Sequence, residues 1–260
     1  MTDERVAARS QDARSRAALA RFKPRNTAFT RGITHLVVGT SRWVMTRWNK
    51  LVLEDHARFA ALSSPAKREG RGLLTFSNHV SLLDDPFIVS NFGLGSYNEI
   101  RWVAADATNF FGGWLRGVIF SAGKCVPLVR GWGEEQLGFH FLRERLRAGD
   151  WVHLFPEGGR TRDPEARLRR PFKSGIGRLL DETRPWALPF SHLGMRAVLP
   201  IGARWPRKGQ VVRVRFGEGQ RVDADFLAAY APHQDDRARW DALTRWAEAQ
   251  LVGLEGSFGG

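Results

Sequence analysis

Apolar and polar positions along the chain follow two periods, which predict strands that alternate with helices. Short continuous apolar runs bounded by turn residues are typical of buried strands. They occur at 72–76, 100–105, 123–130 and 151–155, and as strand and turn at 186–190 and 197–200. Apolar residues at helical spacing predict helices after Pro86 and at 133–149, 175–183 and 224–254. We therefore predict an α/β fold with a mixed, mostly parallel sheet flanked by helices.

Residues 32–56 repeat apolar side chains at helical spacing over about the length of a membrane span. However, Arg42 and Arg47 lie near the middle, and a charge at the bilayer centre costs ~2.5–3.5 kcal/mol. A helix that lies in the membrane interface avoids this cost and can anchor through Trp43 and Trp48. We predict such an amphipathic interfacial helix here; an ordinary helix packed on the domain is the alternative.

The rest of the chain divides into a tail, one large domain and a short end. Residues 1–31 are basic and poor in large apolar residues, which predicts a flexible or loosely helical tail. Residues 57–255 predict the α/β domain. Within it, the aromatic segment 110–120 fits either core packing or the wall of an acyl-chain groove. Residues 210–216 alternate Val with Arg, as in a half-exposed edge strand. Residues 256–260 are expected to be disordered.

The net charge of the chain indicates an anionic binding partner. The 260 residues carry a net charge of +13, which favours nucleic acid, a phospholipid surface or a phosphorylated substrate. No nucleic-acid reading motif is present, so we predict no nucleic-acid partner. Ten Trp fit a bilayer boundary, since Trp prefers sites with one apolar and one wet side. The single Cys, Cys125, excludes an intramolecular disulfide and a cysteine-based zinc site.

His79 and Asp84 are the candidate catalytic pair. His79 follows the predicted strand 72–76, and α/β proteins gather their chemistry at strand carboxyl ends. Five helical steps would place the two side chains about 140° apart, so they can meet only if His79 lies in a loop and Asp84 in the next helix. Asp84 could then fix the imidazole tautomer while the other ring nitrogen takes a proton from a hydroxyl. The alternative is that both residues cap a helix.

The neighbouring Asp85-Pro86 is typical of a helix start. Asp is a good N-cap, and Pro fits the first helical position. We therefore assign Asp85 to structure and Asp84 to chemistry, although the two roles could be exchanged.

Basic residues at two other strand ends are candidates for binding phosphate. A short apolar strand ends at Arg130, whose guanidinium could bind a phosphate in bidentate fashion; a surface ion pair is the alternative. The strand 151–155 runs into a turn that contains Glu157, Gly158 and Arg160. Such a turn can hold a carboxylate, a guanidinium and backbone amides over a crevice. The alternatives are a solvated loop and, for the carboxylate, an ion pair with a nearby Arg.

Four blocks in this order resemble the glycerolipid acyltransferases, which include the lysophosphatidate acyltransferases and their tafazzin branch. The blocks are His79-x4-Asp84, Arg130 after Gly123, Phe155-Pro156-Glu157-Gly158 and Leu188-Pro189-Phe190. Details similar to the tafazzin branch are Ser77-Asn78-His79 before Asp84-Asp85-Pro86, Gly149–His153, Lys173–Leu179 and His192–Met195. The resemblance covers about residues 33–219. Gly159 departs from it, because tafazzins usually have Lys at this place.

The resemblance implies an O-acyltransferase that moves a fatty acyl chain to the free hydroxyl of a lysophospholipid. His79 would be the general base, and Asp84 would orient it. The substrate-binding residues would be Arg130, Glu157, Gly158, Arg160 and Asn78. No metal or redox cofactor is implied, and the acyl donor would be acyl-CoA or a phospholipid.

These observations predict a peripheral membrane enzyme of phospholipid metabolism. It would be a tafazzin-like transacylase, as in cardiolipin remodelling, or a 1-acylglycerol-3-phosphate acyltransferase. Its place would be the cytoplasmic face of a bacterial inner membrane or, in a eukaryote, a mitochondrial membrane. The alternatives are a non-catalytic module that binds anionic lipid through its positive charge, and a lipid esterase in which water replaces the acceptor hydroxyl.

Overall fold

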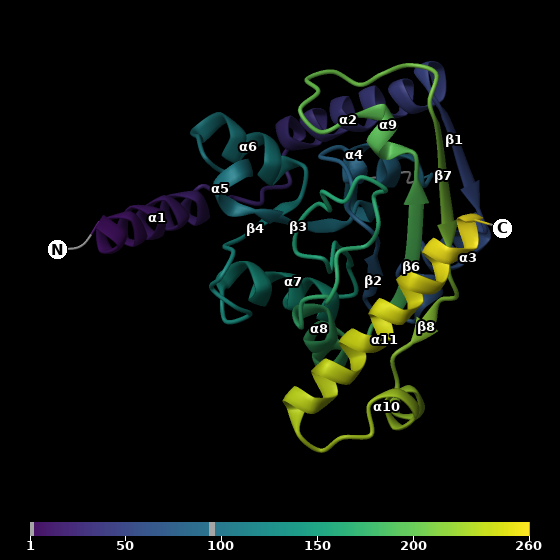
Figure 1. Cartoon of the computed structure of the whole chain (residues 1–260). Helices are drawn as coiled ribbons and strands as arrows, with labels where there is room; N and C mark the ends of the chain where they lie inside the picture. The colour runs from purple at the N-terminus through teal and green to yellow at the C-terminus, as the bar shows by residue number, and fades with distance from the viewer. Residues whose placement is uncertain (1–2, 94–96, 260) are drawn as a thin grey trace.

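The computed structural model describes residues 3–93 and 97–259. Within them, eight strands form one sheet in the order β1-β7-β6-β2-β5-β3-β4, with β8 beside β6 (Figure 1). The strands are β1 (Lys50–Glu54), β2 (Leu73–Phe76), β3 (Trp102–Asp106), β4 (Cys125–Leu128), β5 (Trp151–Leu154), β6 (Trp186–Leu193), β7 (Val211–Phe216) and β8 (Gln220–Arg221). Only the pairs β6–β7 and β6–β8 are antiparallel among these strands. The predicted mixed, mostly parallel sheet is confirmed.

Helices lie on both faces of the sheet. They are α1 (Asp3–Ala20), α2 (Ala28–Trp43), α3 (His56–Leu62), α4 (Asp84–Ile88), α5 (Ala107–Phe110), α6 (Trp114–Ala122), α7 (Leu137–Arg147), α8 (Gly175–Thr183), α9 (Met195–Val198), α10 (Ala224–Tyr230) and α11 (Asp236–Gly256). Successive side chains of a strand point to opposite faces. Accordingly, Leu74 packs in a cluster with α7, α8 and α11, and Leu73 packs in a second cluster with α3 and α4. The two clusters therefore form separate cores on the two faces.

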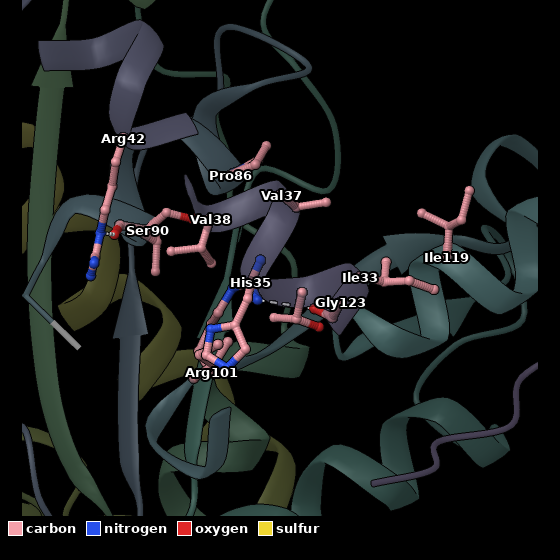
Figure 2. A pocket seen from close by; sticks show the side chains of 13 residues that line it. Ile33, His35, Val37, Val38, Arg42, Pro86, Ser90, Arg101, Ile119 and Gly123 are labelled. Atoms are coloured by element: carbon pink, nitrogen blue, oxygen red, sulfur yellow. Dashed lines mark hydrogen bonds between the residues drawn. The ribbon is translucent and has the colours of Figure 1, made fainter. Parts of the chain in front are cut away.

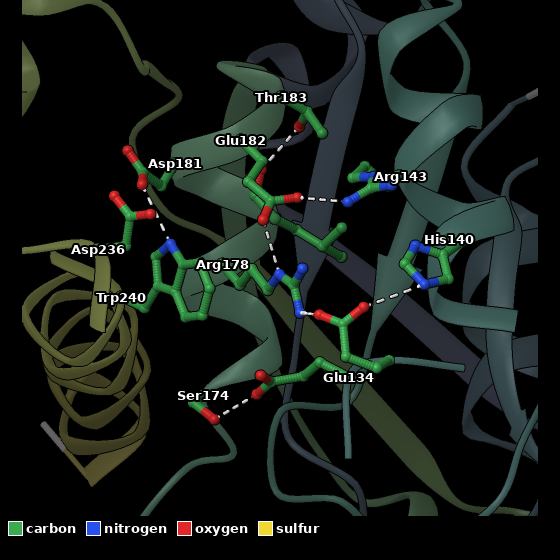
Figure 3. A network of polar contacts seen from close by, with 12 residues as sticks. Glu134, His140, Arg143, Ser174, Arg178, Asp181, Glu182, Thr183, Asp236 and Trp240 are labelled. Carbon is green, nitrogen blue, oxygen red and sulfur yellow. Dashed lines mark hydrogen bonds and ion pairs between the residues drawn. The ribbon is translucent and has the colours of Figure 1, made fainter. Parts of the chain in front are cut away.

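A polar network joins α7, α8 and α11 (Figure 3). Arg143 of α7 donates to Glu182 of α8 at 2.9 Å, and the guanidinium of Arg178 of α8 lies 4.7 Å from the ring centre of Trp240 of α11. Ser174, the residue before α8, donates to Glu134 from the loop before α7. Such linked charge pairs between helices fix their relative placement. The network thereby holds the chain segment that enters α8, which contacts the candidate site described below.

The single helix predicted over 32–56 is wrong in its last part. α2 continues into a π-helical turn, Val44–Trp48, and the chain then forms β1. β1 pairs in parallel with β7 along the whole length of β1, from Lys50 beside Val211 to Glu54 beside Arg215. The interpretation of residues 210–216 as an edge strand is therefore also wrong, because β1 covers that edge.

The two ends of the chain are more ordered than predicted. α1 occupies most of the tail 1–31, which was expected to be flexible or loosely helical, and Ala18 near its end is buried with Phe111 and Val129. The helix expected over 224–254 is two helices, α10 and α11. At the other end, a 3-10 turn over Ser257–Gly259 follows α11 where disorder was expected, and Gly260 lies outside the described residues. Among the helices described, none is both long enough and apolar enough to cross a bilayer.

Candidate active site

His79 and Asp84 lie at the carboxyl end of the central strand β2. β2 ends at Phe76, a short loop carries His79, and α4 begins at Asp84. His79 Nδ1 lies 2.9 Å from Asp84 Oδ2. The loop-then-helix arrangement is thus the one in which the two side chains can meet. Because an ionised carboxylate can only accept, the bond assigns the proton to Nδ1 and leaves Nε2 with its lone pair.

The carboxylate of Asp84 is held from three directions. Besides His79 Nδ1, its Oδ2 accepts the backbone N–H groups of Val80 at 2.7 Å and Ser81 at 2.8 Å. The residue is 1% exposed, and its Oδ1 atom has no hydrogen-bond partner within residues 3–93 and 97–259. Three donors on one oxygen fix the orientation of the carboxylate. Asp84 can therefore hold the imidazole in one tautomer and stabilise its protonated form.

The imidazole of His79 is also fixed by the turn after β5. Its ring stacks on Phe155, with ring centres 4.0 Å apart and planes inclined by 18°. The backbone carbonyl of His79 accepts the N–H of Thr161 at 2.8 Å. The side chain remains 19% exposed, in contrast to its partner Asp84. The ring is thus oriented on both sides yet accessible to a small reacting group.

Glu157 lies beneath the pair rather than facing solvent. One carboxylate oxygen accepts the N–H of His79 at 2.5 Å, and the other accepts the N–H of Arg169 at 2.7 Å. The residue is 1% exposed, and burial raises its pKa to about 7. Both oxygens are used by the backbone, so Glu157 connects the β2–α4 loop to the 157–169 loop. With these contacts Glu157 is suited to position His79, whereas the motif implied that it binds substrate.

Asn78 is also placed differently from expectation. Its side-chain Nδ2 donates to the carbonyl of His192 at 2.9 Å, and its Oδ1 accepts the N–H of His192 at 3.0 Å. In return, His192 Nε2 lies 3.0 Å from the carbonyl of Asn78. Both residues are buried. Asn78, which was expected to bind substrate, therefore joins the ends of β2 and β6.

Arg130 lies near the Glu-Gly turn and keeps an accessible guanidinium. It follows β4, and its Nε donates to Asp106 at the end of β3, at 2.8 Å. A Cβ placed on Gly159 would lie 3.4 Å from one terminal nitrogen of Arg130. The side chain is 63% exposed. Arg130 thus approaches the loop that carries Glu157, with terminal nitrogens oriented by the bond to Asp106.

Gly158 and Arg160 complete the basic side of the site. Gly158 has φ +69°, the left-handed region that favours glycine, and the Lys173 side chain lies 3.0 Å from where its Cβ would be. Arg160 is exposed one residue beyond Gly159. Arg130, Arg160 and Lys173 thus place three cationic side chains beside this turn. Such a group suits a phosphate.

Asp85 makes a buried ion pair with Arg101. Arg101 Nε donates to Asp85 Oδ1 at 2.7 Å, its Nη2 donates to Oδ2, and its Nη1 donates to the carbonyl of Gly123 at 3.0 Å. Asp85 is therefore structural, as predicted, but the reason differs. It is the second residue of α4, and Leu83 occupies the N-cap position.

Three residues that hold the site were given no role by the sequence. Asp106 carries a weak signal, because it directly follows the predicted strand 100–105. His192 lies in a block similar to the tafazzin branch, but its partner Asn78 is 114 positions away, and nothing in the sequence links Arg101 to Asp85. In the part of the chain that the structure describes, no group of three His, Cys, Asp or Glu residues is placed to hold a metal ion.

The fold and the order of these residues define the class of protein. The model of the acyltransferase family matches residues 61–201, more than half of the chain, and the chain belongs to this family. The solved structure of the 1-acyl-sn-glycerophosphate (LPA) acyltransferase PlsC from Thermotoga maritima has the same fold. The two share a TM-score of 0.60 and 18% identity over 89% of this chain and 80% of that one.

Proteins similar to this chain in sequence include two tafazzins and an N-acylphosphatidylethanolamine synthase. The chain is 33% identical over 191 residues to a tafazzin of Dictyostelium discoideum, covering 66% of each protein. It is 39% identical over 193 residues to tafazzin of Drosophila melanogaster, covering 72% of this chain and 50% of that protein. It is 38% identical over 136 residues to N-acylphosphatidylethanolamine synthase of Arabidopsis thaliana, covering 50% and 47%. The matches thus span about half to two thirds of these relatives.

Proposed function

We propose that the protein transfers a fatty acyl group to the free hydroxyl of a lysophospholipid. The observation that carries the proposal is the 2.9 Å contact between His79 Nδ1 and the buried Asp84, which leaves the accessible imidazole with a free basic nitrogen. Membership of the acyltransferase family supports it, as does the similarity to tafazzins over most of this chain.

The proposed reaction uses His79 first as a base and then as an acid. Nε2 removes the proton from the acceptor hydroxyl as the oxygen attacks the acyl carbonyl carbon. Asp84 stabilises the imidazolium that forms, because its carboxylate already accepts from Nδ1. When the tetrahedral intermediate collapses, the bond to the leaving thiolate or alkoxide breaks and Nε2 returns the proton to that group. No covalent acyl-enzyme is required.

Phosphate recognition is assigned to Arg130, Gly158 and Arg160. Arg130 has accessible terminal nitrogens and is oriented by Asp106. The lipid phosphate would lie along the turn, so that the neighbouring glycerol hydroxyl reaches the imidazole. Phosphate held by a planar guanidinium fixes both distance and orientation of the acceptor.

The membrane is the proposed source of acceptor and donor, and α2 is the proposed interfacial helix. The side chains that α2 buries are polar, namely Thr30, Thr34 and Ser41. Its exposed side chains include Phe29 at 69% and Leu36 at 71%. A helix with its apolar side outward and its polar side inward suits a lipid interface. Acyl-CoA and a phospholipid remain the two candidate donors.

The deciding experiment is an acyl-transfer assay with purified protein on vesicles that contain a labelled lysophospholipid. We expect acylated product from the wild type, and almost none from His79→Ala although that variant still binds the vesicles. Running the assay with and without acyl-CoA identifies the donor. Release of free fatty acid in place of acylated lipid would indicate an esterase, and full activity of His79→Ala would refute the proposed base.

A further inference from the structure

Three segments far apart in the sequence share an unusual composition. They are Ala28–Trp48, which is α2 with its π-helical turn, α6, and the loop 199–210 between α9 and β7. Together they contain seven Arg or Lys and no Asp or Glu. The rest of the chain mixes both charges, so the absence of acids here is local. A surface of this kind attracts anions and carries no carboxylate that would repel them.

The loop 199–210 exposes large apolar side chains beside its cations. Trp205 is 82% exposed and Ile201 is 56% exposed. Arg204, Arg207 and Lys208 lie between and after them. A Trp flanked by basic residues on a loop is typical of insertion at the level of lipid headgroups. Within the described residues, Ile201 and Trp205 belong to none of the three hydrophobic clusters.

The loop continues the exposed side of α2. The ring of Trp48 lies 4.8 Å from that of Trp43, and the ammonium of Lys208 lies 4.4 Å from the ring centre of Trp48. The N–H of Gly209 donates to the carbonyl of Trp48 at 2.7 Å. In Figure 1 the loop arches over α2 at one edge of the molecule. The loop and the end of α2 therefore form one continuous surface.

α6 extends this surface at the other end of α2. Val37 of α2, Ile119 of α6 and Arg101 line a cavity of about 100 Å³ (Figure 2). On the same helix, Trp114 is 75% exposed and Leu115 is also exposed. The apolar side chains of α2 and α6 thus meet around the mouth of one cavity.

From this arrangement we propose that α2, α6 and the loop 199–210 form one docking surface for an anionic phospholipid bilayer, with Trp205 inserted into it. The loop is a second anchor that holds the protein in one orientation, which a single interfacial helix cannot do. Charge complementarity selects the occupant, because an apolar protein partner would not require seven cations without an acid. The inference rests on the proposed function, because docking on a bilayer serves an enzyme whose substrates are membrane lipids.

The surface is placed to serve the His79–Asp84 pair. Arg207 of the loop lines a cavity of about 610 Å³ together with Val80 and His192, which flank that pair. The bilayer would thus lie against the edge of the molecule where β2 and β6 end. A lipid could reach the imidazole from this side without leaving the membrane.

The test measures binding without any reaction, so that its failure is distinct from failure of the proposed function. Purified protein is sedimented with vesicles of phosphatidylcholine, with or without about 30% phosphatidylglycerol. We expect Trp205→Ala to weaken binding to the anionic vesicles about tenfold, because a large apolar side chain no longer inserts. The double variant Arg204→Ala and Lys208→Ala should remove most of the preference for anionic vesicles.

Leu137→Ala is the matched control, because Leu137 is 74% exposed on α7 and lies outside the docking surface. It should bind as the wild type does. Circular dichroism and thermal unfolding check that each variant is folded. Transfer between short-chain substrates dissolved below their aggregation limit should be unchanged in Trp205→Ala, while transfer on vesicles falls with binding. Wild-type binding by Trp205→Ala, or an equal loss in Leu137→Ala, would overturn the inference.

Discussion

Asn78 and His192 hold each other by three hydrogen bonds, in which each residue uses both its backbone and its side chain. The bonds join the ends of β2 and β6 directly before His79. His192 Nε2 also lies 3.8 Å from Asp84 Oδ2. The position of the imidazole therefore depends on a strand more than 100 residues away in the sequence.

Asn78→Ala should impair both stability and catalysis. It leaves the buried N–H of His192 without its acceptor, which costs about 1–3 kcal/mol of the free energy of unfolding. A looser loop should lower kcat about tenfold or more. Denaturant titration and steady-state kinetics measure the two effects. Asn91→Ala, which removes a helix-end bond to Phe87 away from the site, is the control and should leave kcat unchanged.

Asp84→Asn separates the charge of Asp84 from its shape. The amide oxygen can take the place of Oδ2, and the amide nitrogen can take the place of Oδ1, which has no hydrogen-bond partner among the described residues. The ring geometry should survive, while kcat falls about 10³–10⁴-fold because the imidazolium loses its counter-charge. The unpaired amide should cost about 1–3 kcal/mol of stability. A kcat within about threefold of the wild type would contradict the role of Asp84.

Arg130→Ala should raise KM for a phosphorylated acceptor about 10–100-fold and change kcat little, because the phosphate contact is lost in ground and transition states alike. Asp106→Asn should give a smaller rise, since Arg130 then keeps its charge but loses its support. Arg237→Ala on α11 is the control with similar exposure, 60% against 63%. Equal KM values for Arg130→Ala and Arg237→Ala would remove the proposed phosphate contact.

Glu157 should make stability depend on pH. Burial raises its pKa from an ordinary 4.5 to about 7, so the folded state holds the proton more tightly than the unfolded state. The stabilisation is complete below pH 4.5 and is lost as the pH rises through 7, with a fall of about 3 kcal/mol in the free energy of unfolding.

The measurement is the free energy of unfolding of the wild type and Glu157→Gln across this range. The free energy of unfolding of the wild type should fall relative to that of Glu157→Gln as the pH rises, because only the wild type must ionise a buried carboxyl. Glu165→Gln, at an exposed position, should give a curve parallel to that of the wild type. Parallel curves for Glu157→Gln would show that the carboxyl titrates as if it were exposed.

The order of strands and helices could be predicted in large part because β2 and β5, at the centre of the sheet, are buried along their whole length. β2 and β5 have no exposed position, and such runs are visible as continuous apolar residues. β1 could not be recognised, because its residues continue the apolar pattern of the helix before it. Its pairing with β7 is a long-range contact, and without it β7 was interpreted as an edge.

For the site, the sequence was informative where partners are close along the chain. His79 and Asp84 are five positions apart, and stereochemistry alone required a loop followed by a helix. The motif identified Asn78 and Glu157 as residues of the site, but it did not show which groups their side chains face. Their carboxamide and carboxylate face backbone groups brought close by the packing of β5 and β6 against β2. A side chain with such partners cannot be distinguished in sequence from one that faces a ligand.

The parallel pairing of β1 with β7 has a mechanical effect. Lys50 stands beside Val211, so the end of the π-helical turn at Trp48 and the end of the loop at Gln210 are tied to the same rung of the sheet. A slip of one residue would shift Trp48 against Lys208 by about 3.3 Å and turn every side chain of β1 to the opposite face. The register of β1 on β7 thus fixes how α2 and the loop 199–210 are placed relative to each other. It would thereby set the angle between the protein and the bilayer surface.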